Sequence, residues 1–372
     1  MPLTSTRFQL VEVTEGTTTF HVPKSEHAKG PKAKEGVPFY NPTMRLARDV
    51  SVLVARVEAA NRPKPLTFCD AMSSLGARGL RIANEVPNAH VTLNDPNLDS
   101  VHLAKQNADA LELKNYDWRM GRLETLLADH RFDWVDIDPF GTPAHYLDLA
   151  VSAVTDGGIL AVSATDKAAL CGVYPEVCLR RYNARPLHNE LMWEVALRIL
   201  LGAVARAAGR RDRWIEPVLA HSTQHYVRVY ARVHEGAGES NRQSASYAYA
   251  WVEPDHARRF NERPPASGDY AGPLWAERFS DARLLEAIVN DLPKWATNDL
   301  RRRLGVLREE AEAPPLYYTI DEFTRSLKKS APKMERLLEG LRDAGHVATR
   351  THFTPRGFKT DAPPAAIARA LR

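Results

Sequence analysis

The stretch WIEPVLAHSTQHYVRVYARVHE (214–235) contains two apolar runs that are separated by only two residues, Thr223 and Gln224. Each run has the length of a β-strand, and parallel neighbours would need a crossover of a dozen or more residues between them. Two residues allow only a reversal of direction. The stretch therefore predicts two antiparallel strands, with the second run as the last strand of its sheet.

Upstream of this pair, short apolar runs alternate with amphipathic helical patterns. The apolar runs lie at 66–72, 90–95, 132–138 and 157–165, and the helical patterns between them lie at 76–86, 97–113 and 144–154. Such alternation is typical of parallel strands that are joined by crossover helices. We therefore expect an α/β fold with a mostly parallel, doubly wound sheet and an antiparallel last strand.

The chain is long enough for two domains, since it has 372 residues. The Pro- and Gly-bearing segment NERPPASGDYAGP (261–273) is the expected boundary between domains 1–262 and 263–372. Beyond it, the pattern includes the order helix, turn, helix and hairpin, which is similar to a winged-helix unit. Residues 263–372 hold 19 Lys and Arg against 15 Asp and Glu, with nine against three from Arg325 to Lys359. The whole net charge of +4 lies there, which favours a polyanion such as nucleic acid as partner.

The sequence contains no pattern for a metal site or a membrane span. Its three cysteines include no CxxC pair, and the spacing of four histidines fits no ligand set (His145, His188, His225, His352). No apolar run reaches 18 residues, and the amino terminus lacks the pattern of a signal peptide. We expect no metal, no membrane association and a cytoplasmic location.

Ligands of open α/β sheets lie beyond the carboxyl ends of the strands, so the residues after each apolar run are the first candidates. DAMSSLGARG (70–79) has small residues that let backbone amides approach a carboxylate at a helix amino terminus. Asp95 follows the second run, 19 residues after Gly76, a spacing suited to ribose hydroxyls, although a helix-capping Asp has the same pattern. Together these two strand ends indicate a cofactor that contains a nucleoside.

The third apolar run ends in Asp138-Pro139-Phe140, which is similar to the (Asp/Asn/Ser)-Pro-Pro-(Tyr/Phe) signature of methyltransferases that act on exocyclic amines of bases. The lone pair of such an amine is delocalised into the ring, so the nitrogen must pyramidalise before it attacks a sulfonium methyl. Asp138 can accept its N–H groups and stabilise the positive charge that develops. Phe140 can stack on an extruded base, and Pro139 stiffens the turn. The alternative is an acidic turn beside a core aromatic.

Six segments, taken in order, resemble the tRNA (guanine-N2)-dimethyltransferases from about residue 8 to the end of the chain. They are EGVPFYNPTMRLARDV, DAMSSLGARGLR, TLNDPN, DIDPFGTP, SATDKAALCGVYPEVCLRRY and ATRTHFTPRGFKTDAP. The resemblance implies a class I, Rossmann-like methyltransferase domain followed by a basic tRNA-binding domain. It also implies transfer of one and then a second methyl group from S-adenosylmethionine to N2 of a guanine in tRNA, with S-adenosylhomocysteine as the product. The usual target is position 26, and some relatives also modify position 27.

The resemblance assigns roles to individual residues by motif. It implies that Asp138 accepts from the guanine amino group, while Phe39 and Phe140 contact the two faces of the base beside Pro139. The implied cofactor contacts are Arg48, Asp70, Ser73, Gly76, Arg78, Asp95 and Gly121, and the implied contacts with tRNA phosphates are Lys328, Lys329 and Arg356. Relatives have an acidic residue followed by alanine where this chain has Met120-Gly121, so Gly121 is expected to offer adenine only its backbone.

Other functions remain open at this point. An adenine-N6 methyltransferase acting on nucleic acid would use the same acceptor chemistry. A nicotinamide-dependent oxidoreductase is disfavoured by the missing GxGxxG and by the antiparallel last strand. In a non-catalytic RNA-binding protein, Asp138 and the two phenylalanines would only hold a turn. No obligatory protein partner is evident.

Overall fold

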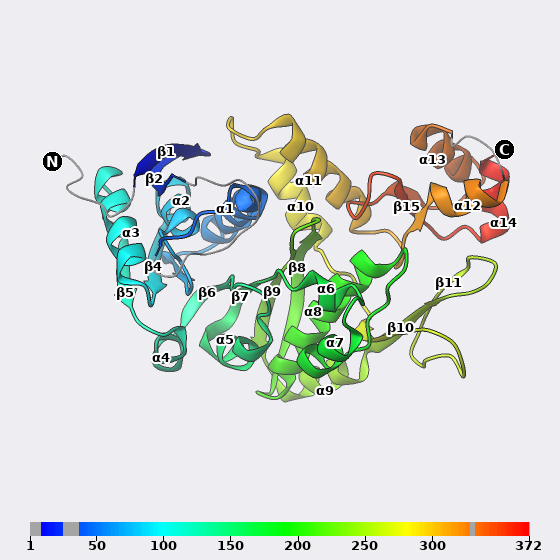
Figure 1. Ribbon diagram of the computed structural model, residues 1–372, viewed down its shortest axis with the longest axis horizontal. Coiled ribbons are helices and arrows are strands. Elements are labelled where there is room, and N and C mark those ends of the chain that lie inside the picture. The colour runs from blue at the N-terminus through cyan, green and yellow to red at the C-terminus, as the bar shows by residue number, and fades with distance from the viewer. Residues whose placement is uncertain (1–8, 25–36, 328–331, 372) are drawn as a thin grey trace.

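A seven-stranded sheet forms the centre of the molecule (Figure 1). The computed structural model describes residues 9–24, 37–327 and 332–371. In spatial order, the strands are β5 (Tyr116–Met120), β4 (Ala89–Asp95), β3 (Leu66–Asp70), β6 (Phe132–Ile137), β7 (Val154–Ala164), β9 (Val227–Glu235) and β8 (Arg213–Ser222). Neighbouring strands are parallel except for β9, which is antiparallel to both β7 and β8. The predicted fold class, including the antiparallel last strand, is confirmed.

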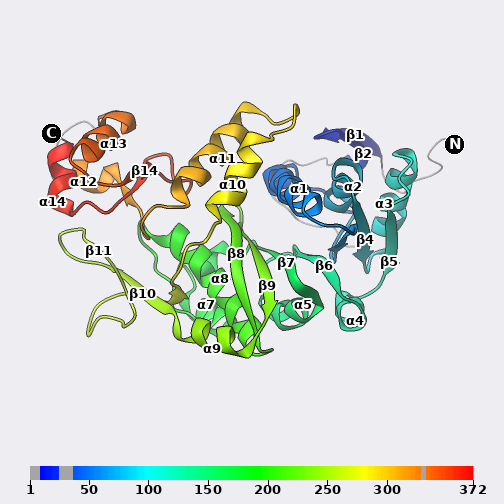
Figure 2. The ribbon, with the colours of Figure 1, turned by 180° about the vertical axis from the view of Figure 1, so that it is seen from behind.

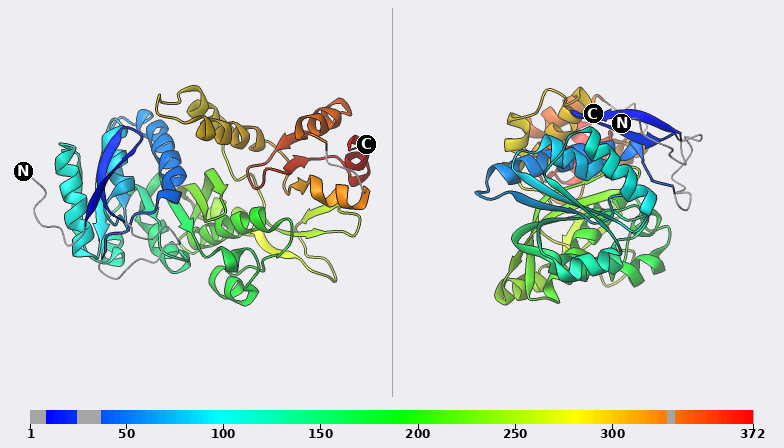
Figure 3. Two further views of the ribbon diagram at one scale, coloured as in Figure 1. Left: turned by 45° about the horizontal axis from the view of Figure 1, so that its top comes forward. Right: turned by 90° about the vertical axis from the view of Figure 1, so that its left-hand side faces the viewer.

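Side chains alternate between the two faces of this sheet, and helices cover both faces (Figure 3). Trp134 and Tyr230 belong to one buried cluster, whereas their neighbours Val135 and Val229 belong to the other. The first face is covered by α1 (Arg45–Ala60), α2 (Ala77–Glu85), α3 (Leu98–Ala110), α10 (Ala282–Asn290) and α11 (Asn298–Glu310), and the second by α4 (Leu123–Asp129), α5 (Leu147–Ala153) and α8 (Met192–Gly209). No helix within the described ranges is long and apolar enough to span a membrane.

Several elements were not among those expected from the sequence. Strand β5 lies at the edge of the sheet, and its residues Asp117 to Met120 are exposed. After α9 (Ala237–Ala245), a separate antiparallel sheet is formed by β10 (Tyr247–Val252), β11 (Arg258–Asn261) and β12 (Ala271–Trp275). Strand β10 pairs with both of the others. The expected domain boundary after residue 262 therefore falls between two strands of one sheet.

An amino-terminal hairpin packs on α2 and α3. It consists of β1 (Leu10–Glu15) and β2 (Thr18–Pro23), and its Phe20 lies in a buried cluster with Leu103 of α3. Arg48 of α1 donates to the two carboxylate oxygens of Glu15 at 2.7 and 2.6 Å. Arg81 of α2 lies 3.4 Å from the same carboxylate. These ion pairs tie the hairpin to the two helices that border the candidate site.

Residues 318–327 and 332–371 fold around a hydrophobic core of their own, which includes Phe323, Leu337, Phe358 and Ile367. The elements are β13 (Tyr318–Thr319), α12 (Ile320–Leu327), α13 (Met334–Asp343), β14 (Ala348–Arg350), β15 (Gly357–Thr360) and α14 (Pro364–Ala370). Strand β15 pairs antiparallel with both β13 and β14. Figures 1 and 2 show this unit at one end of the molecule and the amino-terminal hairpin at the other.

Buried charges join the carboxy-terminal unit to the rest of the chain. We call Glu194, Glu310, His352 and Lys359 the junction cluster. Lys359 Nζ lies 3.1 Å from Glu194 Oε2 and 3.3 Å from Glu310 Oε1, and all three side chains are buried. His352 Nδ1 lies 2.5 Å from Glu310 Oε2, and its Nε2 accepts from the Ser222 N–H at 3.1 Å. Lys359 therefore adds nothing to the exposed positive charge that the sequence indicates for this region.

Candidate active site

The turn after β6 carries Asp138, Pro139 and Phe140 to the carboxyl edge of the sheet. The Asp138 side chain is 21% exposed and Phe140 is 65% exposed, whereas Pro139 is buried. Gly141 follows with a φ of +83°, which residues with a side chain rarely adopt. Its N–H donates to Thr165 Oγ1 at 2.8 Å, and its carbonyl accepts from the Thr165 N–H at 2.9 Å. The turn is thus tied to the end of β7, and Asp138 is neither sealed in the core nor fully solvated.

Arg78 of α2 binds the Asp138 carboxylate directly. Its Nη2 donates to Asp138 Oδ2, while its Nη1 donates to Ser51 Oγ at 2.7 Å and to the Ala47 carbonyl at 3.3 Å. Burial by itself would raise the pKa of Asp138, but the charges of Arg78 and then Arg228 outweigh it and lower the pKa below its ordinary value. Asp138 is therefore an anion at neutral pH, held in one position by a buried guanidinium.

Behind Asp138 lies a second ion pair, Asp136 with Arg228, that no motif singled out. Arg228 Nη2 donates to Asp136 Oδ2 at 2.5 Å, and its Nη1 donates to Ser163 Oγ at 2.7 Å. Asp136 Oδ1 lies 3.4 Å from Arg78 Nε, so Arg78 bridges both aspartates. Two signals for this pair exist in the sequence. Asp136 precedes Asp138 by two residues, as side chains on one face of a strand do, and Arg228 interrupts an apolar run.

Phe39 and Phe140 are in direct contact. Their ring centroids are 4.8 Å apart and their planes meet at 79°, an edge-to-face arrangement. The Phe39 N–H donates to Ser74 Oγ at 2.8 Å, and the same hydroxyl lies 3.0 Å from the Phe39 carbonyl. The structure thus brings Phe39 beside the turn of Asp138 and Phe140. A base between two parallel rings would need about 7 Å between them, twice the van der Waals contact distance, so this pair is closed.

The turn between β3 and α2 is built for close approach of a ligand to the backbone. Gly76 has a φ of +85° and directly precedes the first residue of α2. The Ser73 N–H donates to the Asn94 carbonyl at 2.8 Å, which fixes the turn against β4. Asp70 is buried and accepts from the Gly79 N–H at 3.0 Å. Burial, followed by the charge of Asp136, raises the pKa of Asp70 to about 7. Asp70 is therefore placed to hold the start of α2.

Asp95, at the end of β4, braces the same turn. Its Oδ2 accepts from the Ser74 N–H at 2.8 Å, and its Oδ1 accepts from the Asn97 N–H at 2.9 Å. Burial raises the pKa of Asp95, although these two amides oppose the rise. The cap of α3 is Asn97, whose side chain accepts from Asp99 and Ser100. Asp95 is thus not the capping residue of this helix.

Gly121 lies beside Asp95, at the end of β5. Its N–H is 3.4 Å from the Asp95 carbonyl. A Cβ built on Gly121 would have no heavy atom within 4 Å among the described residues other than its two chain neighbours, and the preceding Met120 is exposed. Open space therefore exists where the resemblance implies adenine. Arg48, in contrast, is buried and its guanidinium is engaged by Glu15.

Comparison with known proteins decides the family. Residues 16–372 match the family described as N2,N2-dimethylguanosine tRNA methyltransferase. The chain belongs to this family. It is 35% identical to the tRNA (guanine(26)-N(2))-dimethyltransferase of Thermococcus kodakarensis, over 98% of this chain and 99% of that protein. It is 34% identical to the protein of the same name from Pyrococcus abyssi, over 95% and 97% of the two chains.

A solved structure agrees with this membership of the dimethylguanosine methyltransferase family. Trm1 from Pyrococcus horikoshii, in complex with S-adenosyl-L-methionine, matches with a TM-score of 0.86 and 32% identity, covering 98% of this chain and 100% of that chain. The expected fold, family and enzyme class are confirmed. The roles of individual residues stay predictions.

Of the three residues predicted to bind tRNA phosphates in this methyltransferase, the structure describes one. Lys328 and Lys329 lie outside the described residues. Arg356 is exposed and forms two hydrogen bonds of 2.7 Å with the carboxylate of Asp321. A phosphate must therefore compete with Asp321 for this guanidinium.

Proposed function

We propose that this chain transfers two methyl groups in succession from S-adenosylmethionine to N2 of the guanine at position 26 of tRNA. The names of the relatives support that position, and position 27 is a second target that the same assay tests. The observation that carries the proposal is the anionic Asp138 at the carboxyl edge of the sheet, beside the rings of Phe39 and Phe140.

Asp138 serves the amino group of the base. By accepting an N–H, its carboxylate draws the nitrogen out of conjugation, and its charge stabilises the positive charge that develops on N2 during the transfer. Arg78 keeps the carboxylate ionised, so Asp138 is a weak base and the proton released after each transfer passes on to solvent. N2-methylguanine retains one N–H, which Asp138 accepts in the second transfer.

Phe39 and Phe140 bind the two faces of the guanine after their edge-to-face contact opens. Stacking of a base on an aromatic side chain contributes about 1–3 kcal/mol, which compensates for the contact that is lost. Pro139 stiffens the turn that carries Phe140. Because Ser74 holds Phe39 and also donates its N–H to Asp95, the base site and the cofactor turn share one residue.

The turns around β3, β4 and β5 fit S-adenosylmethionine. Asn94 Oδ1 is buried without a hydrogen-bond partner among the described residues, and the space beside Gly121 is open. When bound, the cofactor supplies an electrophilic methyl group on a sulfonium. The residues that hold it are the backbone of Ser73 and Gly76 at its methionine end, Asp95 at the ribose and Gly121 at the adenine, with Asp70 fixing α2. Arg78 acts through Asp138, and Arg48 acts through the amino-terminal hairpin.

The basic part, 263–372, grips the tRNA backbone, with contacts from Lys328, Lys329 and Arg356. Its helices α10 and α11 pack on α1 in the core of the catalytic part, 1–262, and its own hydrophobic core begins at Tyr318. Phosphate contacts of this kind position a nucleic acid without reading its sequence.

The experiment is methylation of an unmodified tRNA transcript with labelled S-adenosylmethionine, followed by nucleoside analysis and mapping of the methylated position. For Asp138→Asn we expect turnover to fall by roughly 10²–10³-fold with unchanged cofactor affinity, because the side chain keeps its shape but loses its charge. Asp148→Asn is the matched control, since that exposed carboxylate pairs with Arg210. Formation of dimethylguanosine at the normal rate by the Asp138 variant would remove its proposed role. If the product is N6-methyladenosine, the adenine-specific alternative is favoured. If the protein does not bind the cofactor, a non-catalytic RNA-binding protein is favoured.

A further inference from the structure

Three large apolar side chains in α7 (Pro175–Tyr182) and in the two residues before it are exposed. Val173 and Leu179 are each 50% exposed and Tyr174 is 58% exposed, and they make up three of the nine exposed large hydrophobic residues in the described chain. Val173 and Tyr174 directly precede α7, and Leu179 lies on its outer face with Arg180. We call Val173, Tyr174, Leu179 and Arg180 the α7 surface. Apolar groups that gather on a surface mark an interaction site more often than single ones do.

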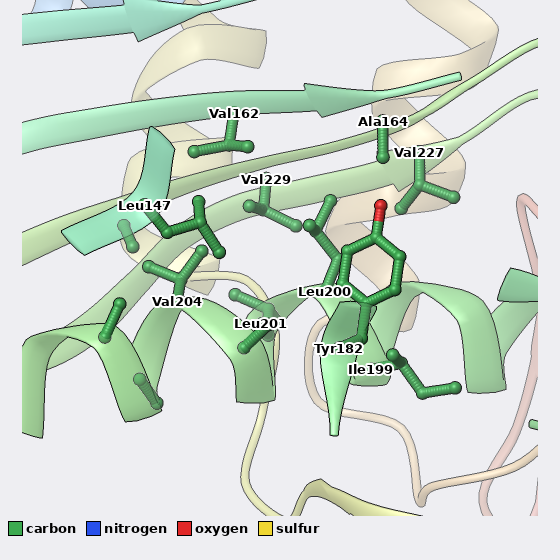
Figure 4. Packing of buried hydrophobic residues seen from close by; sticks show 14 of the residues in the cluster. Leu147, Val162, Ala164, Tyr182, Ile199, Leu200, Leu201, Val204, Val227 and Val229 are labelled. Atoms are coloured by element: carbon green, nitrogen blue, oxygen red, sulfur yellow. The ribbon is translucent and has the colours of Figure 1, made fainter. Parts of the chain in front are cut away.

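The exposure of this surface does not result from a loosely attached helix. The inner face of α7 is anchored by Cys178 and Tyr182, which are both buried. Figure 4 shows Tyr182 against Ile199 and Leu200 of α8. The Tyr182 hydroxyl donates to Asp166 Oδ1 at 2.7 Å. The outer side chains are therefore presented to solvent by a rigid support.

Helix α7 is linked to the turn that carries Phe140, because the hydroxyl of its last residue, Tyr182, lies 2.8 Å from Thr142 Oγ1. Gly141 pairs with Thr165, and α6 (Lys167–Leu170) starts two residues later. The N–H groups of Val173 and Tyr174 both donate to the carbonyl of Ala168, at 2.9 and 3.2 Å. Hydrogen bonds therefore join the turn of Phe140 to the segment that carries Tyr174.

One arginine of the segment, Arg180, is available to contact an anion. Residues 173–185 contain three arginines and one glutamate. Arg181 donates to Asp166 at 3.1 Å, and Arg185 donates to Asp269 at 3.0 Å. Arg180 is exposed and forms no ion pair with the described residues, which leaves its guanidinium available beside Leu179. An exposed tyrosine with a nearby arginine is the combination that stacks on bases and contacts phosphates.

We propose that the α7 surface binds the nucleotides next to the target guanine in tRNA, with the Tyr174 ring stacked on a base and Arg180 at a phosphate. This inference rests on the proposed function, because it takes the guanine beside Phe140 as its starting point. A patch of three apolar side chains is small for a stable protein interface, which buries about 800 Å² on each partner. A protein partner is therefore the less favoured occupant.

The test compares Tyr174→Ala with Tyr174→Phe, which retains the ring, and uses Val11→Ala on the amino-terminal hairpin as a surface control for Val173→Ala. Tyr174→Ala should weaken tRNA binding, and raise KM for tRNA, about 10-fold. The affinity for S-adenosylmethionine should not change, and Tyr174→Phe should behave like the wild type. Val173→Ala should weaken tRNA binding more than Val11→Ala does, and Arg180→Ala should lower the slope of log Kd against log salt by about one.

Unchanged tRNA affinity in Tyr174→Ala, while the wild type methylates tRNA, would overturn this inference and leave the proposed function intact. A dimer of the wild type that dissociates in Tyr174→Ala would also overturn it, in favour of a protein interface. If the wild type neither bound nor methylated tRNA, the proposed function would fail first and this inference with it.

Discussion

Glu310 allows the charge balance of the junction cluster to be tested quantitatively. Burial by itself would raise its pKa, but His352 and then Lys359 outweigh it and lower the pKa from 4.5 to about 2. That difference corresponds to roughly 3 kcal/mol of folding free energy at neutral pH. Because the pKa is lower in the folded state, this contribution is fully present above pH 4.5 and is lost as the pH falls toward 2.

Glu310→Gln preserves the volume of the side chain but removes its charge, and Glu194 then remains as the one counter-ion of Lys359 in the described part of the chain. We expect the free energy of unfolding, measured by urea denaturation, to fall by roughly 3 kcal/mol at pH 7. The gap between wild type and variant should narrow below pH 4.5. Glu335→Gln makes the same change at an exposed carboxylate that pairs with Arg350, and should have no measurable effect. A Glu310 variant as stable as wild type at pH 7, or a loss of equal size at pH 7 and pH 3, would refute this account.

Four further variants test the site and the proposed tRNA contact. Arg78→Met should raise the pKa of Asp138, so its methylation rate should fall at acid pH values where the wild type is still active, and identical pH profiles would contradict the ion pair's role. Gly79→Ala should destabilise the fold by about 1–3 kcal/mol in thermal unfolding, because the new Cβ would clash with a methyl group of Leu93. Gly121→Ala should leave the stability unchanged, and calorimetry should show weaker binding of the cofactor. Arg356→Ala should weaken tRNA binding and lower the salt slope by about one, and an unchanged slope would place the phosphate elsewhere.

The sheet was predictable because its strands are covered on both faces. Buried strands such as β6 and β7 need nearly continuous apolar runs, and the helices between them need an apolar stripe, so both leave a periodic signal. Strand β5 leaves none, since an edge strand with exposed side chains can be built from residues such as Asp117 and Arg119. The sheet of β10, β11 and β12 was not predicted, for a different reason. Pro and Gly residues interrupt the sequence before β12, and such residues indicate a domain boundary.

Within the site, the sequence predicted which residue types are present, but it did not predict which side chains contact one another. The Asp-Pro turn at a strand end follows from the local sequence, but the contact of Asp138 with Arg78 joins positions 60 residues apart, with two strand–helix units and β6 between them. The resemblance assigned Arg78 to the cofactor, whereas in this structure its guanidinium lies between Asp138 and Asp136. Lys359 makes the same point, because a count of charges cannot tell a solvated lysine from one buried between two glutamates.

Helix α2 sets the spacing between the two halves of the reaction. Its first residue follows the turn that is proposed to bind the methyl donor. The next residue, Arg78, holds the Asp138 carboxylate that is proposed to bind the amino group of the guanine. Gly79 lets the helix pack closely against Leu93 of the sheet, where a Cβ would clash. One short helix therefore joins the two proposed binding regions, so that a shift of α2 would displace both of them at once.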